Sequence, residues 1–303
     1  MKHNIRRIIS LASVLVVGSA AIGMFAGCTT QHPEVTITYS FNGKNYSVRY
    51  VLSRNDAPRT VQHFLELADA GFYDDLCVHD FEEDGAIYSG GYYFDEDGEL
   101  QEVDYLNTVK RLEEEKGITF TQSVWKMNEN KTPLYTVYGE FKANNVETQY
   151  SRENRHSMGA LVMYYTDKGK FNDDVWVERA DGGKNNDGKV TEFKPYKYNS
   201  ATSLFYTYTG SSSAKLDNDY CVFGMANEDQ LKTFLDAIKN YIAGLTADED
   251  DESVSFTEEI FWDSNHFNQF DDYEEVRHGD GTATYQTPVE KPIIIKSVKV
   301  NKY

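Results

Sequence analysis

Residues 57–91 read APRTVQHFLELADAGFYDDLCVHDFEEDGAIYSGG and carry the clearest structural signals in the chain. Asp56 is a candidate N-terminal cap, Pro58 suits the first turn of a helix, and Gly71 follows its end. The apolar residues at helical spacing share one face: Val61, Phe64, Leu65 and Ala68. We therefore predict an amphipathic helix that packs against a sheet.

A β-hairpin is predicted before this helix. Two runs of alternating apolar and polar residues, VTITYSF and YSVRYVL, lie within 35–52. Asn42 and Gly43 separate them, and this dipeptide is the strongest short-range signal for a tight hairpin turn.

The rest of the chain is expected to be mostly β, with long polar stretches between its elements. Helices are predicted at 102–116, ending at Gly117, and at 228–243, ending at Gly244. Strands are predicted within 139–165, 204–208, 220–225 and 292–300. The stretch 167–197 is expected to be a surface loop, and 246–286 is expected to be acidic and irregular. This composition favours an antiparallel barrel or sandwich.

Several segments together resemble one family, the cyclophilins. The matching segments, with the family patterns that they resemble, are 57–65 (APxTVxNF), 71–74 (GFYDG), 79–91 (HRxIPGFMIQGG, with one extra residue here), 139–141 and 158–163 (GEF and RGxLSMA), 199–206 (NSASSQFFI), 216–224 (LDGxYxVFG) and 291–295 (the last strand). Their common order along the chain makes the resemblance specific.

The resemblance implies a mainly β fold, a cyclophilin-like eight-stranded antiparallel barrel with two capping helices and long inserted loops. Residues 35–303 would form this domain, with insertions near 92–135, 167–197 and 246–286. It also implies peptidyl-prolyl cis-trans isomerase activity on X–Pro bonds, with proline-containing peptides as ligands and no cofactor.

The resemblance places the substrate groove at twelve positions. They are His79, Asp80, Ala86, Ile87, Ser89, Met163, Tyr164, Tyr165, Leu204, Tyr206, Leu216 and Tyr220. Twisting an X–Pro amide breaks its resonance against a barrier of about 18–20 kcal/mol. Cyclophilins assist this step with an arginine, a nearby glutamine and an apolar proline pocket.

The catalytic side chains of the family are replaced in this sequence. Asp80 stands at the arginine position and Ser89 at the glutamine position. Loss of one fixed donor lowers a rate about 10²–10³-fold in other enzymes, so we expect weak or absent isomerase activity and assign no catalytic residue. Tyr164 and Tyr165 either fill the groove or form an aromatic platform for a peptide or a sugar ring.

The N-terminus resembles a bacterial lipoprotein signal peptide. Residues 1–27 contain three basic residues, no acidic residue and an apolar stretch at 8–25, and FAGC ends at Cys28. The resemblance implies that Cys28 is acylated and that 28–34 is a tether. We therefore expect a lipid-anchored protein on the extracytoplasmic face of the cell membrane, acting on exported proteins.

Charge and motifs exclude several other functions. The net charge is −19, and removal of the three basic leader residues leaves −22, which argues against a nucleic-acid partner. No metal-site or nucleophile motif is present, and 181–188 departs from the EF-hand spacing. Cys77 and Cys221 are either one disulfide or, as we prefer, two buried thiols.

Two functions therefore remain open from the sequence. One is a surface-anchored isomerase that assists the folding of exported proteins. The other is a non-catalytic cyclophilin-like module that binds peptides or another partner. The long acidic insertions leave room for a further interaction role.

Overall fold

The computed structural model describes residues 32–126, 131–141, 155–164, 174–178, 191–195, 200–212, 220–246, 257–261, 282–288 and 291–303. Several predictions concern residues outside these ranges: the signal peptide at 1–27, Cys28, the loop at 181–188, Tyr165 and Leu216.

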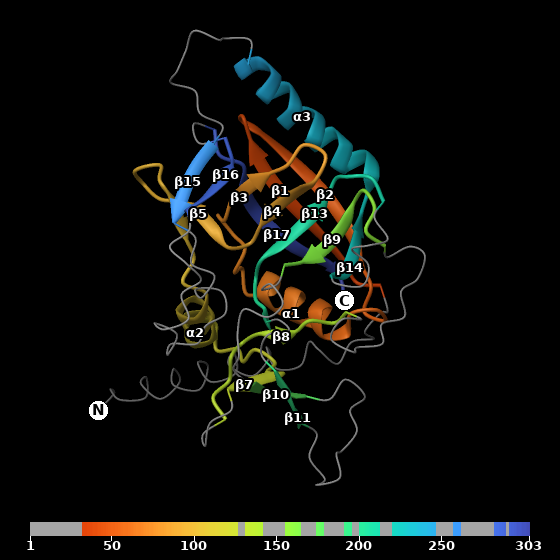
Figure 1. Ribbon diagram of the computed structural model, residues 1–303, viewed down its shortest axis with the longest axis vertical. Helices are drawn as coiled ribbons and strands as arrows, with labels where there is room; N and C mark the ends of the chain where they lie inside the picture. The colour runs from red at the N-terminus through yellow and green to blue at the C-terminus, as the bar shows by residue number, and fades with distance from the viewer. Residues whose placement is uncertain are drawn as a thin grey trace, which may run out of the picture.

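An eight-stranded antiparallel sheet forms the centre of the molecule (Figure 1). Its order is β17-β1-β2-β14-β9-β13-β4-β3. The strands are β1 (Glu34–Phe41), β2 (Lys44–Leu52), β3 (Val78–Phe81), β4 (Ala86–Ser89), β9 (Ala160–Met163), β13 (Phe205–Tyr208), β14 (Cys221–Ala226) and β17 (Ile294–Lys302). The mainly β, cyclophilin-like fold expected from the sequence is confirmed in this curled sheet.

The predicted β1–β2 hairpin is confirmed. Asn42 (φ 48°) and Gly43 (φ 73°) both adopt the left-handed conformation that a tight two-residue turn requires. Alternate residues of β1 face the interior and are at most 1% exposed: Val35, Ile37, Tyr39 and Phe41. The period of two in the sequence therefore identifies the buried face directly.

The sheet curls until its two edge strands meet at one end. The amide of Val78 donates to the Ile293 carbonyl at 2.9 Å, and the amide of Ile295 donates to the Leu76 carbonyl at 2.7 Å. A further bridge joins Cys77 to Ile294. The start of β3 thus satisfies its backbone groups on the start of β17, which leaves less of either edge unpaired.

Two helices cover opposite ends of the curled sheet in Figure 1: α1 (Pro58–Asp69) and α3 (Glu228–Thr246). From α1, Phe64 packs in the interior against Phe205 and Phe223, with ring centroids 5.5 and 5.1 Å away. From α3, Phe234 stacks on Tyr39 at 4.5 Å. The predicted end of α3 at Gly244 is wrong, because the helix continues to Thr246.

The N-terminus of α1 is satisfied by a residue far away in the sequence. The predicted cap Asp56 is wrong, because the N-cap residue is Ala57, which has no side chain able to cap. Instead, a carboxylate oxygen of Glu140 accepts the amide of Thr60 at 2.9 Å and its hydroxyl at 2.9 Å. The same carboxylate accepts the amide of Arg59 at 3.1 Å. Glu140 is only 4% exposed, so this is a buried anion at a helix N-terminus.

Burial raises the pKa of Glu140, and the hydrogen bonds from Thr60 and Arg59 oppose that rise. The carboxylate therefore replaces the water that it loses with three donors at the start of α1. This arrangement ties 139–141 to the helix, and Phe141 beside it is also buried.

The segments outside the central sheet also contain helices and strands. The predicted helix α2 (Tyr105–Lys116) is confirmed, with Asp104 as its cap and Gly117 left-handed at its end. The other elements outside the central sheet are β5 (Tyr92–Phe94), β6 (Leu100–Glu102), β7 (Val124–Lys126), β8 (Val137–Tyr138), β10 (Asp174–Glu178), β11 (Thr191–Pro195), β12 (Ser200–Ala201), β15 (Thr257–Phe261) and β16 (Thr282–Gln286).

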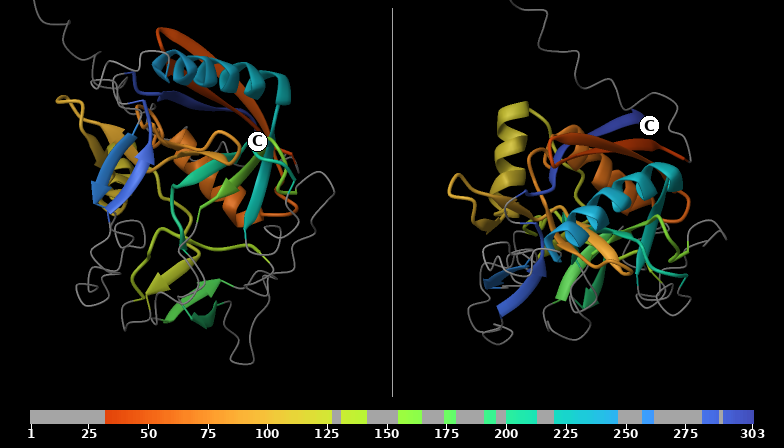
Figure 2. Two further views of the ribbon diagram at one scale, coloured as in Figure 1. Left: turned by 45° about the horizontal axis from the view of Figure 1, so that its top comes forward. Right: turned by 90° about the horizontal axis from the view of Figure 1, so that it is seen from above.

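Two of the regions expected to be irregular contain pairs of antiparallel strands instead. Strands β10 and β11 lie in the expected surface loop, and they join β7 in a three-stranded sheet (Figure 2). Strands β15 and β16 pair within the acidic region. The physical reason is composition: short β-forming runs such as DVWVE and TATYQ find a partner strand despite their polar surroundings.

Both cysteines of the folded part are buried free thiols, as preferred from the sequence. Burial raises the pKa of Cys77 and of Cys221. They lie in the interior as small apolar groups, and Cys221 Sγ is 3.4 Å from the hydroxyl oxygen of Thr60.

Replacement of the buried cap tests its importance. We expect Glu140→Ala to lower the free energy of unfolding by at least about 2 kcal/mol, because donors at the start of α1 lose their acceptor. Urea unfolding followed by circular dichroism measures this. The control Glu115→Ala removes an exposed carboxylate paired with Arg111 at 2.8 Å and should change stability by less than about 0.5 kcal/mol. Equal effects of the two substitutions would contradict the role of Glu140.

Candidate functional site

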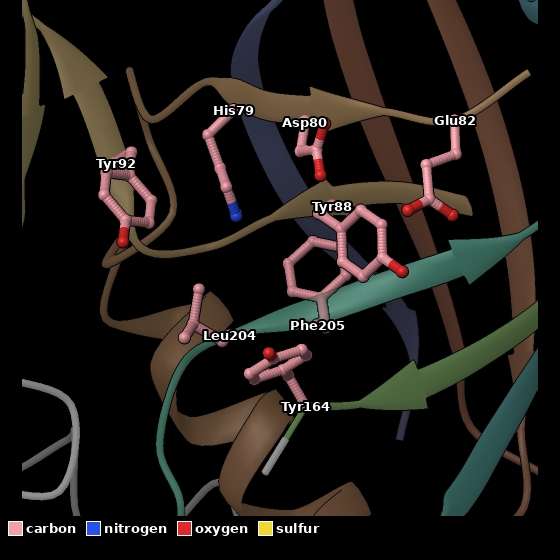
Figure 3. A pocket seen from close by; sticks show the side chains of 8 residues that line it. All are labelled: His79, Asp80, Glu82, Tyr88, Tyr92, Tyr164, Leu204 and Phe205. Atoms are coloured by element: carbon pink, nitrogen blue, oxygen red, sulfur yellow. The ribbon is translucent and has the colours of Figure 1, made fainter. Parts of the chain in front are cut away.

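A small pocket lies beside β3, β4 and the start of β13 (Figure 3). Its volume is about 210 Å³, below the roughly 300–1,000 Å³ typical of sites for drug-sized ligands. It therefore suits one side chain or ring rather than a large cofactor. The lining residues are His79, Asp80, Glu82, Tyr88, Tyr92, Tyr164, Leu204 and Phe205.

A β-bulge directs two consecutive residues to this pocket. The β3–β4 register shifts between Val78 and Asp80, with Val78 opposite Ser89 and Asp80 opposite Tyr88. In a regular strand His79 and Asp80 would point to opposite faces, but the extra residue re-aims one of them. Both side chains consequently line the pocket, as Figure 3 shows.

The pocket wall at Leu204 is positioned by a close approach of two backbone segments. Gly90 has a φ of +95°, and a Cβ atom there would lie 2.3 Å from the carbonyl oxygen of Ser203. Only glycine allows this approach. Nearby, the Nε2 atom of His63 in α1 lies 2.7 Å from the carbonyl oxygen of Thr202. Helix α1 and Gly90 thus hold the segment that leads to Leu204 in the pocket wall.

The pocket has an acidic rim and a neutral histidine. Burial lowers the pKa of His79 from 6.5 to about 3, so its imidazole is uncharged near neutral pH. Its ring packs on Tyr92, with centroids 4.4 Å apart. Burial raises the pKa of Tyr88, and the negative charges of Glu82 and Asp80 raise it further.

A second cluster of aromatic side chains adjoins the pocket on the same face of the sheet. Tyr206 is 5% exposed, and its hydroxyl lies 2.9 Å from Nε2 of the fully buried His156. The rings of Tyr206 and Tyr220 are 6.2 Å apart, and Tyr88 packs on Tyr206 at 5.3 Å. The space beside Tyr206 is therefore filled by protein.

The structure brings together only part of the groove expected from the sequence. His79, Asp80, Tyr164 and Leu204 line the pocket. Ala86, Tyr206 and Tyr220 belong to the adjoining cluster.

The expected groove requires correction at three positions. Ile87, Ser89 and Met163 face the interior and are at most 1% exposed. The physical reason is strand alternation: Ala86 and Tyr88 point outward, so Ile87 and Ser89 between and after them point inward.

The sequence reasoning also missed four residues that line the pocket: Glu82, Tyr88, Tyr92 and Phe205. Tyr88 could have been predicted from the period of two along β4, because Tyr88 shares a face of the strand with Ala86. No comparable signal marks Glu82, which follows β3 in the turn, or Tyr92, which follows the glycine pair.

Comparison with known families identifies the fold. The family model described as cyclophilin type peptidyl-prolyl cis-trans isomerase/CLD matches residues 36–258. The chain belongs to the cyclophilin-type peptidyl-prolyl cis-trans isomerase family. This family-level match supports isomerase function of the cyclophilin type and binding of proline-containing peptides.

Solved cyclophilins resemble the chain at low identity. A cyclophilin type peptidyl-prolyl cis-trans isomerase of Cryptosporidium parvum has 16% identity and a TM-score of 0.39, covering 90% of this chain and 99% of that chain. The same protein in the presence of the dipeptide Ala-Pro has 14% identity and a TM-score of 0.37, covering 89% and 99%. The Mimivirus cyclophilin has 14% identity and a TM-score of 0.38, covering 70% and 80%. No curated protein matches the chain by sequence.

Within this cyclophilin, the pocket offers little support for charge-based catalysis. Asp80 and Glu82 contribute two carboxylates to its lining. No lysine or arginine lines the pocket among the residues that the structure describes. The described lining therefore contains no fixed cation of the kind that would assist a twisting amide.

The part of the chain that the structure describes contains neither a cluster of metal-ligand side chains nor a helix suited to span a membrane. No group of three or more histidine, cysteine or acidic side chains is arranged to hold a metal ion within those residues. Within the same residues, no helix combines the length and apolar character needed to cross a membrane.

The buried His79 predicts a specific pH dependence. Between pH 6.5 and about 3, the unfolded chain binds a proton at His79 that the folded chain does not. The free energy of unfolding should therefore fall as the pH drops below 6.5, by up to about 1.4 kcal/mol per pH unit from this group. We expect His79→Asn to flatten the slope in urea unfolding between pH 7 and pH 5. An identical slope in both proteins would show that His79 takes up its proton in the folded state.

Proposed function

We propose that this cyclophilin binds proline-containing segments of exported proteins and accelerates X–Pro isomerisation only weakly. The observation that carries the proposal is the presence of Asp80 in the pocket. The sequence resemblance aligns this residue with the family arginine. The fold and its pocket remain available for peptide binding, while the group that assists the twisted amide is reversed in charge.

The physical argument concerns the transition state. The barrier of about 18–20 kcal/mol comes from amide resonance, and an enzyme lowers it by favouring the twisted amide over the planar one. Twisting localises the lone pair on the amide nitrogen, where a cation or a hydrogen-bond donor stabilises it; an ionised carboxylate has no proton to donate and repels that lone pair. An apolar and aromatic pocket can still bind the planar X–Pro peptide. We therefore propose that the protein keeps affinity for the peptide and loses most of the rate acceleration.

A second candidate is a purely non-catalytic binding module. The observation that favours it is the filled space beside Tyr206, where His156 and Tyr220 pack against the ring. Tyr206 corresponds to a residue of the family's proline pocket, so its burial leaves less room there for a proline ring.

The activity proposal is tested by prolyl isomerisation of a short X–Pro peptide. We expect the chain to accelerate the reaction at least about 100-fold less than an arginine-bearing cyclophilin assayed beside it. Asp80→Arg should raise the acceleration by about tenfold or more, because it restores a cation in the pocket.

Asp84→Arg makes the same charge change on the neighbouring turn, at an exposed position outside the pocket, and should leave the rate unchanged. Acceleration by the wild-type chain within tenfold of the arginine-bearing protein would overturn the proposal. Equal effects of the two substitutions would show that the net charge of the protein, rather than a charge in the pocket, controls the rate.

We also propose that Cys28 carries a lipid anchor that holds the protein on the extracytoplasmic face of the membrane. The support is the basic, apolar and FAGC pattern of the first 28 residues. Two or three acyl chains would give stable anchoring, whereas one chain alone is marginal.

Lipidation is tested by metabolic labelling with a radioactive fatty acid and by membrane fractionation of bacterial cells. Cys28→Ala should abolish the label and move the protein out of the anchored fraction. Thr29→Ala, at the next position, should retain both properties. Unchanged labelling of the Cys28 variant would contradict the anchor.

A further inference from the structure

The pocket has an unusual combination of side chains. Asp80 is half-buried within it and Glu82 is exposed at its rim, so two carboxylates face one small space. Figure 3 shows both carboxylates directed toward the ring of Tyr88. They belong to neighbouring positions on one side of the pocket.

Aromatic rings form much of the remaining wall. Tyr88 and Tyr164 meet edge to face with centroids 6.3 Å apart, and both are half-buried. Tyr92 is buried and packs on the neutral imidazole of His79. The face of a tyrosine ring carries partial negative charge and attracts a cation within about 6 Å of its centroid. The rings and the carboxylates therefore both attract a positive charge.

The two carboxylates also act on the hydroxyl of Tyr88. Burial raises the pKa of Tyr88, and the charges of Glu82 and Asp80 raise it further, because they oppose a further negative charge at this hydroxyl. A positive charge entering the same space would be attracted for the same reason. The partial burial of the pocket strengthens this attraction relative to that in water.

We propose that this pocket binds the cationic side chain of a lysine or arginine in the bound peptide. Its volume of about 210 Å³ accommodates one extended side chain, with the stem on Leu204 and the aromatic rings and the charge near Asp80 and Glu82. This inference rests on the proposed peptide-binding function and adds a residue preference to it.

A metal ion fits the same pocket less well. Calcium takes six to eight oxygen ligands, and the described lining provides two carboxylates among aromatic and aliphatic groups. A side chain with an apolar stem and a charged end matches both parts of that lining.

Binding of matched peptides to the full chain in detergent micelles tests the inference. The probes are acetyl-Ala-Lys-Pro-Ala-amide, its norleucine analogue, which keeps the stem without the charge, and its glutamate analogue. A fourth probe, acetyl-Ala-Lys-Ala-Ala-amide, lacks the proline. Calorimetric titration at low and high salt measures each dissociation constant.

We expect the lysine peptide to bind about tenfold more tightly than the norleucine peptide, and the glutamate peptide to bind most weakly. The preference for lysine should decrease at high salt, because Glu82 is exposed at the rim. Asp80→Asn and Glu82→Gln should each reduce the preference for the lysine peptide over the norleucine peptide several-fold.

Glu83→Gln is the matched control. It removes the same charge from the adjacent position, where the carboxylate pairs with Lys239 at 3.3 Å outside the pocket, and it should keep the preference. Because Glu82 and Glu83 are both exposed, neither substitution is expected to disturb folding, and circular dichroism verifies this.

The outcomes separate the two proposals. Equal affinity for the lysine and norleucine peptides overturns the cation pocket, and proline-dependent binding of both would leave the peptide-binding function intact. Carboxylate-dependent binding of the lysine peptides with and without proline supports the cation pocket and removes proline recognition from the proposed function. Absence of binding by every probe overturns both.

Discussion

The carboxylate of Glu140 at the start of α1 is the contact on which the arrangement of the site depends. It fixes the helix through the amides of Arg59 and Thr60, and the helix in turn places His63 against the carbonyl of Thr202. Ser203 follows, and its carbonyl oxygen closely approaches Gly90 between β4 and β5. Leu204 follows Ser203 in the chain and Tyr88 precedes Gly90, and both line the pocket. The buried carboxylate of Glu140 therefore helps to position the pocket wall through α1.

The framework and the pocket of this cyclophilin depend on different kinds of residue. The framework needs buried apolar side chains and a few fixed backbone contacts, and these are present in the hairpin, in Phe64 and at Gly90. The charge of the pocket depends on a few side chains at its surface, Asp80 and Glu82 among them, which do not belong to the core. The family fold therefore fixes where a ligand can bind, and the pocket side chains decide which chemistry follows.

Sequence patterns predicted features that depend on neighbours along the chain. Asn42 and Gly43 specified the hairpin turn, and Gly117 marked the end of α2, because these signals act within a few residues. The cap of α1 was missed because its acceptor, Glu140, is 80 positions from Thr60. Ile87 and Ser89 were placed in the groove by the family resemblance, although alternation along β4 points them inward. The bulge at His79 and the pairing of β7 with β10 depend on contacts that no local pattern encodes.

The pairing of β1 with β17 has a consequence for how the molecule folds. β1 has β17 as one of its two neighbours, and the Asn301 side chain even reaches Thr36, 265 positions away. A chain emerging from the ribosome holds β1 without that neighbour until β17 has also been synthesised. The central sheet is therefore completed only after β17 is available, and its many long-range pairings favour slow folding. Until then, one side of β1 presents backbone donors and acceptors that could pair with another strand.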